Sequence, residues 1–325
     1  MRRNLLVTII VLPVLVLLVF APIIVQHDPY MLHIFINMGI GVIMAVTIAM
    51  ILSVGEITIA HAAFMAIGAY TSALLTMRLG VNFWLALPAS GMTGAIVALL
   101  IGLPLFRLKR IYFAICSAVF GIVVYLAFGS LWIPVFGGCN GIANIPPPDA
   151  ISIPGLFRVE FTSFSSCYYI LLFLVAVTVY VMYRIANSRY GKILQSIAQA
   201  DTLAQSVGIN LTFYKLFLFS IACFFASIAG SYFAHTFSFI CPAYFTLWNS
   251  IYYLIYAQVG GVNSVAWPAI SGFMFPGIAE LLRPVKEFEP VVFGLILIVV
   301  MYFLPAGLAS LPEKARTLLG KILAK

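Results

Sequence analysis

The sequence predicts an all-α, polytopic membrane protein. Of its 325 residues, 64% are hydrophobic and 8% are charged, whereas about a quarter of the residues of an average soluble domain are charged. The apolar residues gather in uncharged runs of about 20 residues, which is long enough for a helix to cross the hydrocarbon core of a bilayer. These observations exclude a soluble globular fold.

Ten spans are expected, some of them short or broken. The runs place them at residues 5–25, 34–55, 57–77, 82–106, 111–132, 164–183, 216–236, 245–262, 264–282 and 289–308. The first run follows Arg2 and Arg3 like a signal peptide, but it is long and lacks a small-residue cleavage site, so we interpret it as a span. An even number of passes places both termini on one side, and residues 1–325 are expected to form a single transmembrane domain.

Basic residues divide unequally between the two sides of this topology. Thirteen lie on one side, which leaves four on the other: Arg78, Arg158, Arg283 and Lys286. The positive-inside rule makes the first side cytoplasmic. Both termini and a polar loop at about residues 185–213 are therefore expected in the cytoplasm, and a Gly- and Pro-rich loop at about residues 134–163 in the periplasm. The net charge of +8 reflects this orientation and does not indicate nucleic-acid binding.

The polar loop is amphipathic. Between residues 184 and 215, apolar residues recur at three- and four-residue spacing and polar residues fill the other face. Asp201 is expected to cap a second short helix, and Gly208 to end it in the left-handed conformation. We therefore predict two short helices, or one broken helix, whose apolar stripe is buried on the membrane surface, the underside of the protein or a partner.

Two regions fit simple spanning helices poorly. Residues 53–77 hold Glu56 and His61 among small residues, and residues 215–280 are interrupted by glycine and proline. Irregular backbone at membrane depth is tolerated only where protein or a watery cavity surrounds it. Glu56 and His61 are therefore candidates for lining a translocation path. The alternatives are an interfacial Glu56 with a local hydrogen-bond partner and a hydrogen-bonded His61 in the core.

Three further residues are path candidates with structural alternatives. Asn140 lies in the glycine-rich segment 137–141, where exposed backbone N–H groups can approach a solute or the chain can simply turn. Tyr256 and Gln258 place polar tips on an apolar helix, and they serve either the path or an interfacial belt.

The sequence has no glycine-rich loop ending in Gly-Lys-Ser/Thr, no catalytic triad and no metal-ligand cluster. We therefore expect neither an enzyme nor a cofactor-binding chain. An ion-coupled secondary transporter of a small organic solute, with Glu56 and His61 as proton carriers, is the alternative function; it would call for buried acidic groups at the membrane midplane, which the sequence almost lacks.

Four stretches of the sequence, at residues 55–75, 137–142, 188–216 and 260–272, together carry a family likeness. With them the chain resembles, over nearly its whole length after the first span, the LivM-type permease subunits of branched-chain amino acid ABC importers. The resemblance implies a translocation pore in the bacterial inner membrane. It also implies two cytoplasmic ATPases that hold ATP and magnesium, a LivH-like second permease or a second copy of this chain, and a periplasmic or surface solute-binding protein.

The resemblance places the ATPase contact on the polar loop, where the candidate coupling residues are Arg189, Gly191, Ile197, Asp201, Ala204, Gly208 and Ile209. Arg189 has an alternative role as an anchor to lipid phosphates. Two features depart from the family pattern: Glu56 replaces the usual Gln, and residues 198–200 are uncharged where charges are common. The first leaves the identity of the amino acid open, and the second makes apolar burial the larger part of the expected ATPase contact.

Overall fold

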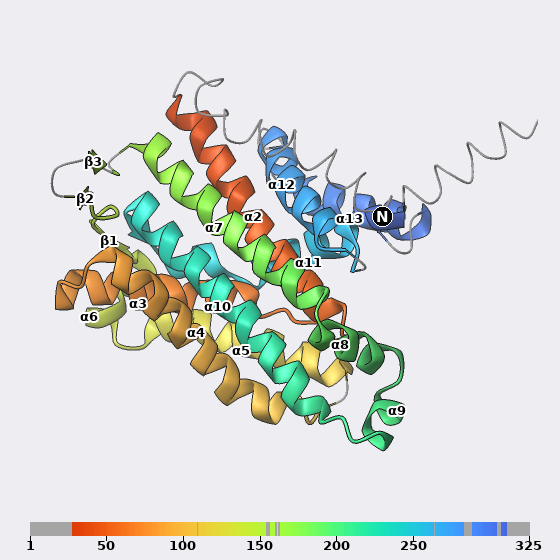
Figure 1. Cartoon of the computed structure of the whole chain (residues 1–325). Helices are drawn as coiled ribbons and strands as arrows, with labels where there is room; N and C mark the ends of the chain where they lie inside the picture. The colour runs from red at the N-terminus through yellow and green to blue at the C-terminus, as the bar shows by residue number, and fades with distance from the viewer. Residues whose placement is uncertain are drawn as a thin grey trace, which may run out of the picture.

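The computed structural model describes residues 28–108, 110–153, 157–159, 161, 163–262, 264–282, 288–303 and 307–310. Helices make up nearly all of the regular structure of these residues (Figure 1), so the predicted all-α class is confirmed. The predicted first span at 5–25 and both termini lie outside the described residues, and the predicted sidedness of the termini stays a prediction.

Among the described residues, six helices are long and apolar enough to cross a membrane. They are α2 (Pro29–Leu52), α3 (His61–Leu79), α4 (Phe83–Leu105), α5 (Arg110–Ser130), α7 (Phe164–Ala186) and α10 (Leu211–Phe237). They match six of the predicted spans, namely 34–55, 57–77, 82–106, 111–132, 164–183 and 216–236. Side chains start several of them: Asp28 accepts from the Tyr30 N–H at 3.0 Å, and Asn82 from the Trp84 N–H at 2.9 Å.

The last three predicted spans are shorter helices, α11 (Leu247–Gly260), α12 (Ala266–Leu281) and α13 (Glu289–Phe303). They contain 14, 16 and 15 residues, which corresponds to about 21–24 Å at 1.5 Å per residue, less than the ~30 Å hydrocarbon core. Within residues 215–280, where glycine and proline suggested short or broken helices, α11 and α12 are short, whereas α10 is a continuous helix of 27 residues.

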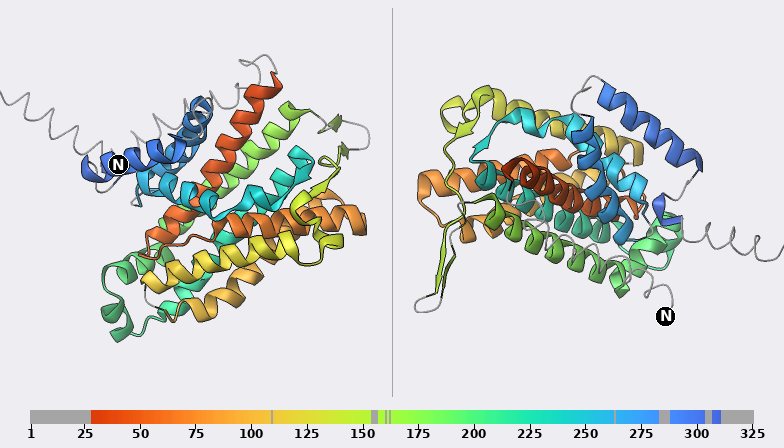
Figure 2. Two further views of the ribbon diagram at one scale, coloured as in Figure 1. Left: turned by 180° about the vertical axis from the view of Figure 1, so that it is seen from behind. Right: turned by 90° about the horizontal axis from the view of Figure 1, so that it is seen from above.

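Helices α2 and α10 lie at the centre of the bundle. α10 packs against α3, α4 and α2, while α2 also packs against α7, α11 and α12, as Figures 1 and 2 show. The most apolar windows of α10 and α2 are 78% and 72% buried, compared with 22% for α5. The apolar outer face of α5 is therefore left for lipid or for another subunit.

Small residues bring α3 and α10 into close contact. A Cβ atom on Gly230 of α10 would lie 1.8 Å from the Met65 carbonyl oxygen of α3, so only glycine fits there. Ser227 of α10 donates to the Phe64 carbonyl oxygen at 2.8 Å. The small residues Ala60, Ala62, Ala63, Ala66 and Ala69 of this stretch are all buried.

Helices α3 and α10 run parallel to each other, so their C-terminal ends lie at the same end of the bundle. At one end, Ser72 of α3 lies 2.8 Å from the imidazole of His235 near the end of α10. The Gly- and Pro-rich loop at this end contains short elements: α6 (Ile133–Phe136), η1 (Gly138–Asn140), β1 (Ile142–Ala143), β2 (Ile151–Ile153) and β3 (Phe157–Val159). β1 pairs antiparallel with β4 (Phe239–Ile240), and β2 with β3. Beyond β4 lies η2 (Pro242–Phe245), and η4 (Leu308–Ser310) follows α13.

The opposite end carries the polar loop, which forms α8 (Arg189–Gln199) and α9 (Asp201–Ser206) between α7 and α10 (Figure 1). Of the two arrangements predicted there, two short helices or one broken helix, the structure has the first. The connection between α2 and α3 also reaches this end: residues 53–55 form a turn and residues 56–60 are non-helical. The predicted span at 57–77 therefore begins only at His61, and the predicted irregular backbone before it is confirmed.

Candidate functional site

The helix pair α8–α9 folds back onto the end of α7. Ser188 starts α8 by accepting from the Gly191 N–H at 3.3 Å. A Cβ atom on Gly191 would lie 2.3 Å from the Ala186 carbonyl oxygen at the end of α7, so glycine permits the reversal. α8 and α9 then lie beside the first turns of α10 (Figure 1).

The inward face of the pair is buried in the protein itself. Gly191, Leu194, Ile197 and Ala204 are buried, and the last three belong to the main hydrophobic core. Of the places open to the predicted apolar stripe, the underside of the protein is the one that this face occupies. Gly191, Ile197 and Ala204, three of the predicted coupling residues, therefore hold the pair in place and are not open to direct contact with a partner.

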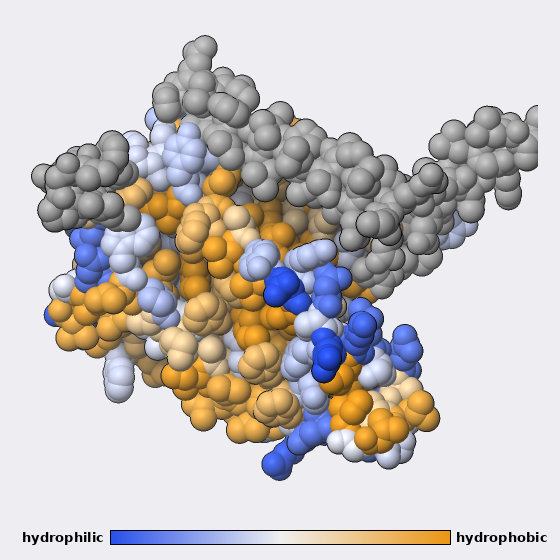
Figure 3. All heavy atoms as spheres, viewed as in Figure 1, coloured by the Kyte–Doolittle hydropathy of each residue, from blue (hydrophilic) through white to orange (hydrophobic). Residues whose placement is uncertain are grey.

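The buried stripe was predicted to continue through α9, but it does not. Leu203 and Val207 are 71% and 73% exposed, although the periodicity placed them on the face of Ala204. Figure 3 shows an apolar patch over α9 beside hydrophilic side chains of α8. We call Leu203 and Val207 the α9 patch. Arg189 is exposed on α8, so the outward surface combines a cation with this small apolar patch.

Gly208 ends α9 as predicted. Its φ of +83° is a left-handed conformation that suits glycine, and the Ile209 N–H donates to the Ala204 carbonyl oxygen at 3.1 Å. A Cβ atom on Gly208 would meet nothing within 4 Å. Its requirement for glycine is therefore one of backbone conformation and not of space, and Ile209 is half-buried at the start of the link to α10.

The predicted capping role of Asp201 is wrong. α9 begins at Asp201 itself, the preceding Ala200 has the cap position, and no side chain caps the helix. The carboxylate of Asp201 instead turns toward Lys215 in α10, with 3.5 Å between Oδ2 and Nζ. A nearby cation thus competes successfully with the local cap for this carboxylate.

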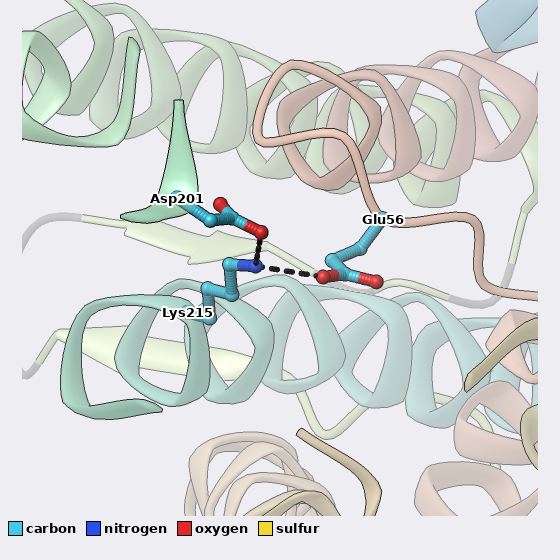
Figure 4. A network of polar contacts seen from close by, with 3 residues as sticks. All are labelled: Glu56, Asp201 and Lys215. Atoms are coloured by element: carbon cyan, nitrogen blue, oxygen red, sulfur yellow. Dashed lines mark hydrogen bonds and ion pairs between the residues drawn. The ribbon is translucent and has the colours of Figure 1, made fainter. Parts of the chain in front are cut away.

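Lys215 joins three segments that are distant in sequence. Its Nζ also donates to Glu56 Oε1 at 2.8 Å, so the ammonium lies between the two carboxylates, as Figure 4 shows. The side chains of Lys215 and Glu56 are 8% and 5% exposed, and that of Asp201 is 38% exposed. Breaking a buried pair such as Glu56–Lys215 typically costs about 3–5 kcal/mol, because the remaining charge loses its partner, whereas solvent screens the contact with Asp201.

A cavity of about 500 Å³ lies against this network. Glu56, Asp201 and Lys215 line it together with Arg107 and an apolar group: Phe106, Leu108, Ile111, Tyr112 and Leu211. The cavity is therefore bounded by the turn between α4 and α5, by α9 and by the start of α10. The chemistry of its wall, with charges of both signs beside apolar side chains, suits a small amphipathic solute.

A second contact fastens α8 to the same part of α10. The Tyr190 hydroxyl donates to the carbonyl oxygen of Tyr214, the residue before Lys215, and the two rings lie 5.0 Å apart. Burial raises the pKa of Tyr190 well above its usual range, which keeps the hydroxyl protonated as a donor. Both helices of the pair are thus tied to adjacent residues of α10.

Serine side chains from other helices support the non-helical segment after Glu56 and the first turn of α3. Ser117 of α5 accepts from the Ile59 N–H, and Ser250 of α11 from the Ala62 N–H, each at 3.0 Å. His61 follows this segment with a fully buried ring, and neither ring nitrogen has a hydrogen-bond partner among the described residues. The hydrogen-bonded alternative for His61 is thus not realised within the described part of the chain.

The other predicted path residues lie away from Glu56 and His61. Asn140 is exposed at the opposite end of the bundle, in a segment whose glycines at 137, 138 and 141 all have positive φ, as a tight turn requires. Tyr256 of α11 is buried, and its ring stacks on Phe275 at 5.2 Å. Gln258 is half-buried two residues later. The structure brings together Glu56 and Asp201, with His61 close by in sequence, and does not place these three beside them.

Sequence reasoning missed Lys215, Tyr190 and the α9 patch as functional candidates. Lys215 was counted only as one of the basic residues on the cytoplasmic side. Glu56, an acidic residue between two apolar runs, was a usable signal, because a carboxylate near the membrane calls for a cation and Lys215 begins the next uncharged run.

A bundle of membrane-length helices, with broken backbone and a charged network at one end, defines a multi-pass membrane protein with the features of a transporter. The model of the family described as "Branched-chain amino acid transport system / permease component" matches residues 30–305, and the chain belongs to this family. It is therefore a permease subunit of an ABC importer in the bacterial inner membrane, as the resemblance implied.

Two curated relatives support this assignment. The chain is similar to the high-affinity branched-chain amino acid transport system permease protein LivM of Salmonella typhimurium (strain LT2) and of Escherichia coli (strain K12). In each comparison 28% of residues are identical over 301 residues, which cover 86% of this chain and 68% of the relative. No solved structure matches the chain.

Proposed function

We propose that this permease subunit carries branched-chain or closely related small amino acids, and that ATPase subunits drive it through α8 and α9. Membership of the family implies ATPase subunits and membrane partners in general. The finer assembly that we propose contains two cytoplasmic ATPases, which hold ATP and magnesium, a second permease of the LivH type or a second copy of this chain, and an external solute-binding protein.

The α9 patch is the single observation that carries the docking proposal. Leu203 and Val207 are each more than two thirds exposed, although Leu194, Ile197 and Ala204 of the same apolar stripe are buried. Apolar side chains that project from a polar helix pair suit a groove on a partner. Because the inward face packs against α7 and α10, a force on the patch is passed to the bundle.

The proposed path begins at the cavity beside Glu56 and passes His61, with Asn140 at the far end and with Tyr256 and Gln258 as further candidates. Apolar and charged groups in the wall of this cavity agree with a zwitterionic amino acid that has an apolar side chain. Ion-coupled transport by Glu56 is less well supported, because Lys215 already pairs with its carboxylate.

The docking proposal is tested by the double variant Leu203→Asp/Val207→Asp in the assembled transporter. We expect the ATPase subunits to co-purify with this variant at least about tenfold less than with the parent, since two charges replace the apolar anchors of the contact. ATP-dependent uptake should fall with them, while the amount of the permease in the membrane stays the same.

Leu79→Asp is the matched control. Leu79 is also 71% exposed, but it lies at the end of α3, at the opposite end of the bundle from α9. This variant should retain the ATPases. Undiminished co-purification of the ATPases with the Leu203→Asp/Val207→Asp variant would overturn the docking proposal.

A further inference from the structure

The ion network at Lys215 connects the proposed docking helix α9 with α10 and with the α2–α3 connection. Asp201 is the first residue of α9, Lys215 lies in the second turn of α10, and Glu56 belongs to the connection between α2 and α3. Together the two ion pairs of Lys215 join three segments that are distant in sequence. The network therefore reaches from the proposed docking helix into the core.

The two contacts of Lys215 differ in strength. The bond to Glu56 is 2.8 Å long and both partners are buried, whereas the contact with Asp201 is 3.5 Å long and Asp201 is 38% exposed. Water can replace the contact with Asp201 at little cost, but not the contact with Glu56. A displacement of α9 would thus act first on the Asp201 contact, and Lys215, which stays attached to Glu56, would pass the resulting change in its charge balance to that carboxylate.

The carboxylate of Glu56 depends on this lysine. Glu56 Oε2 and Asp201 Oδ1 are buried, and neither has a hydrogen-bond partner among the described residues. If Lys215 lost its charge, two carboxylates would face the same space without the cation between them, and their repulsion would push α9 and the α2–α3 connection apart. The position of the connection therefore depends on the charge of Lys215.

A shift of Glu56 extends beyond its own segment. Residues 56–60 do not belong to a helix. Ser117 of α5 binds the Ile59 N–H, and Ser250 of α11 binds the first turn of α3. The connection thus contacts α5 directly and continues into α3, whose first turn α11 holds. Movement of Glu56 would change the relation of these helices at that point.

We propose that Lys215 is a positioning residue that passes the movement of α9 to the α2–α3 connection, and so couples ATP hydrolysis to the opening of the path. This inference rests on the proposed function, in which ATPases dock on α9. Tyr190 holds α8 to Tyr214 while α9 moves, so that the displacement is concentrated at Asp201. The coupling element is the Lys215 ammonium, which binds the Glu56 carboxylate more closely than that of Asp201.

The test uses the complete transporter, with its ATPases, second permease and binding protein, reconstituted in vesicles. Lys215→Met should leave the ATPases bound and hydrolysing ATP, but the amount of leucine taken up per ATP should fall about tenfold, within the 5–150-fold range of typical coupling effects. Lys215→Arg, which keeps the charge, should restore most of the ratio. A purely structural role would lower hydrolysis and uptake together and leave their ratio unchanged.

Asp201→Asn tests the same point with little risk to folding, because Asp201 is partly exposed; it should lower the ratio in the same direction. Arg184→Met is the control: Arg184 is an exposed cation in the last turn of α7 at the same end of the bundle, and its loss should leave the ratio unchanged.

A parental ratio in both Lys215→Met and Asp201→Asn, with the ATPases still bound, would overturn this inference and leave the docking proposal intact. Failure of the docking proposal would be seen differently, as ATPases that still co-purify with the Leu203→Asp/Val207→Asp variant.

Discussion

A single left-handed residue decides how α9 joins α10. Gly208 has a φ of +83°, and its turn lets the Ile209 N–H close onto the Ala204 carbonyl oxygen. Side chains with a branched Cβ are strongly disfavoured in this conformation. The direction in which α9 presents Leu203 and Val207 therefore depends on the backbone of one residue.

Gly208→Val should cost about 1–2 kcal/mol of local conformational free energy and lower the initial rate of ATP-dependent uptake severalfold, because the turn must change to accommodate it. Gly208→Asn is the matched control, since asparagine tolerates the left-handed region better than other residues. The measurement is uptake into membrane vesicles at equal permease content. Equal uptake by the Val and Asn variants would show that this turn does not set the position of α9.

At the level of residues, local chemistry was predictable from the sequence and long-range pairing was not. The left-handed end of α9 follows from a glycine after an amphipathic run, and Gly208 was predicted correctly. Asp201 was predicted as a cap because the local rule sees only the next few residues. Its partner Lys215 and the third member Glu56 come from other segments, and no periodicity in one segment encodes such a meeting.

At the level of elements, the contact between α3 and α10 depends on the absence of a side chain. Gly230 lies so close to Met65 that a Cβ atom would be 1.8 Å from its carbonyl oxygen. In membranes, where lipid is as apolar as the helix surface, such close packing is a major source of helix association. This contact therefore aligns the helix that carries the path candidate His61 with the helix that carries Lys215, which lines the cavity.

Gly230→Val should reduce the yield of folded permease, because the obstacle is backbone and cannot rotate away; overpacking of this kind costs about 1–3 kcal/mol or more. The measurement is the fraction of monodisperse protein after detergent extraction, together with its melting temperature. Gly294→Val is the control, since a Cβ atom at Gly294 of α13 would meet nothing within 4 Å. Similar yields and melting temperatures for the two variants would contradict the packing argument.

The helices themselves were predictable because hydropathy and length are local properties. Six predicted spans coincide with α2, α3, α4, α5, α7 and α10 to within a few residues. Boundaries failed where tertiary contacts supply hydrogen bonds: residues 57–60 look like the start of a span, but Ser117 satisfies the Ile59 N–H and the helix begins at His61. The short strands near β1 also escaped prediction, because β1 pairs with β4 from a distant part of the chain.

At the level of the whole molecule, the described helices form a bundle to which the pair α8–α9 is attached at one end. The sequence contains no nucleotide-binding loop of the Gly-Lys-Ser/Thr type. The pair α8–α9 links α7, which packs on α2, to α10, which packs on α3, α4 and α2. A displacement of this pair therefore reaches both central helices, which is the arrangement that an external motor requires.

Vesicles that contain this chain alone should accumulate no leucine, with or without ATP or a proton gradient, because a bistable bundle without an energy source can only equilibrate its solute. Adding the second permease, the ATPases and the binding protein should produce ATP-dependent accumulation. The measurement is radiolabelled leucine retained inside the vesicles, and a complex whose ATPases cannot hydrolyse ATP is the control. Accumulation by the chain alone under a proton gradient would instead favour ion-coupled transport, with Glu56 released from Lys215 during the cycle.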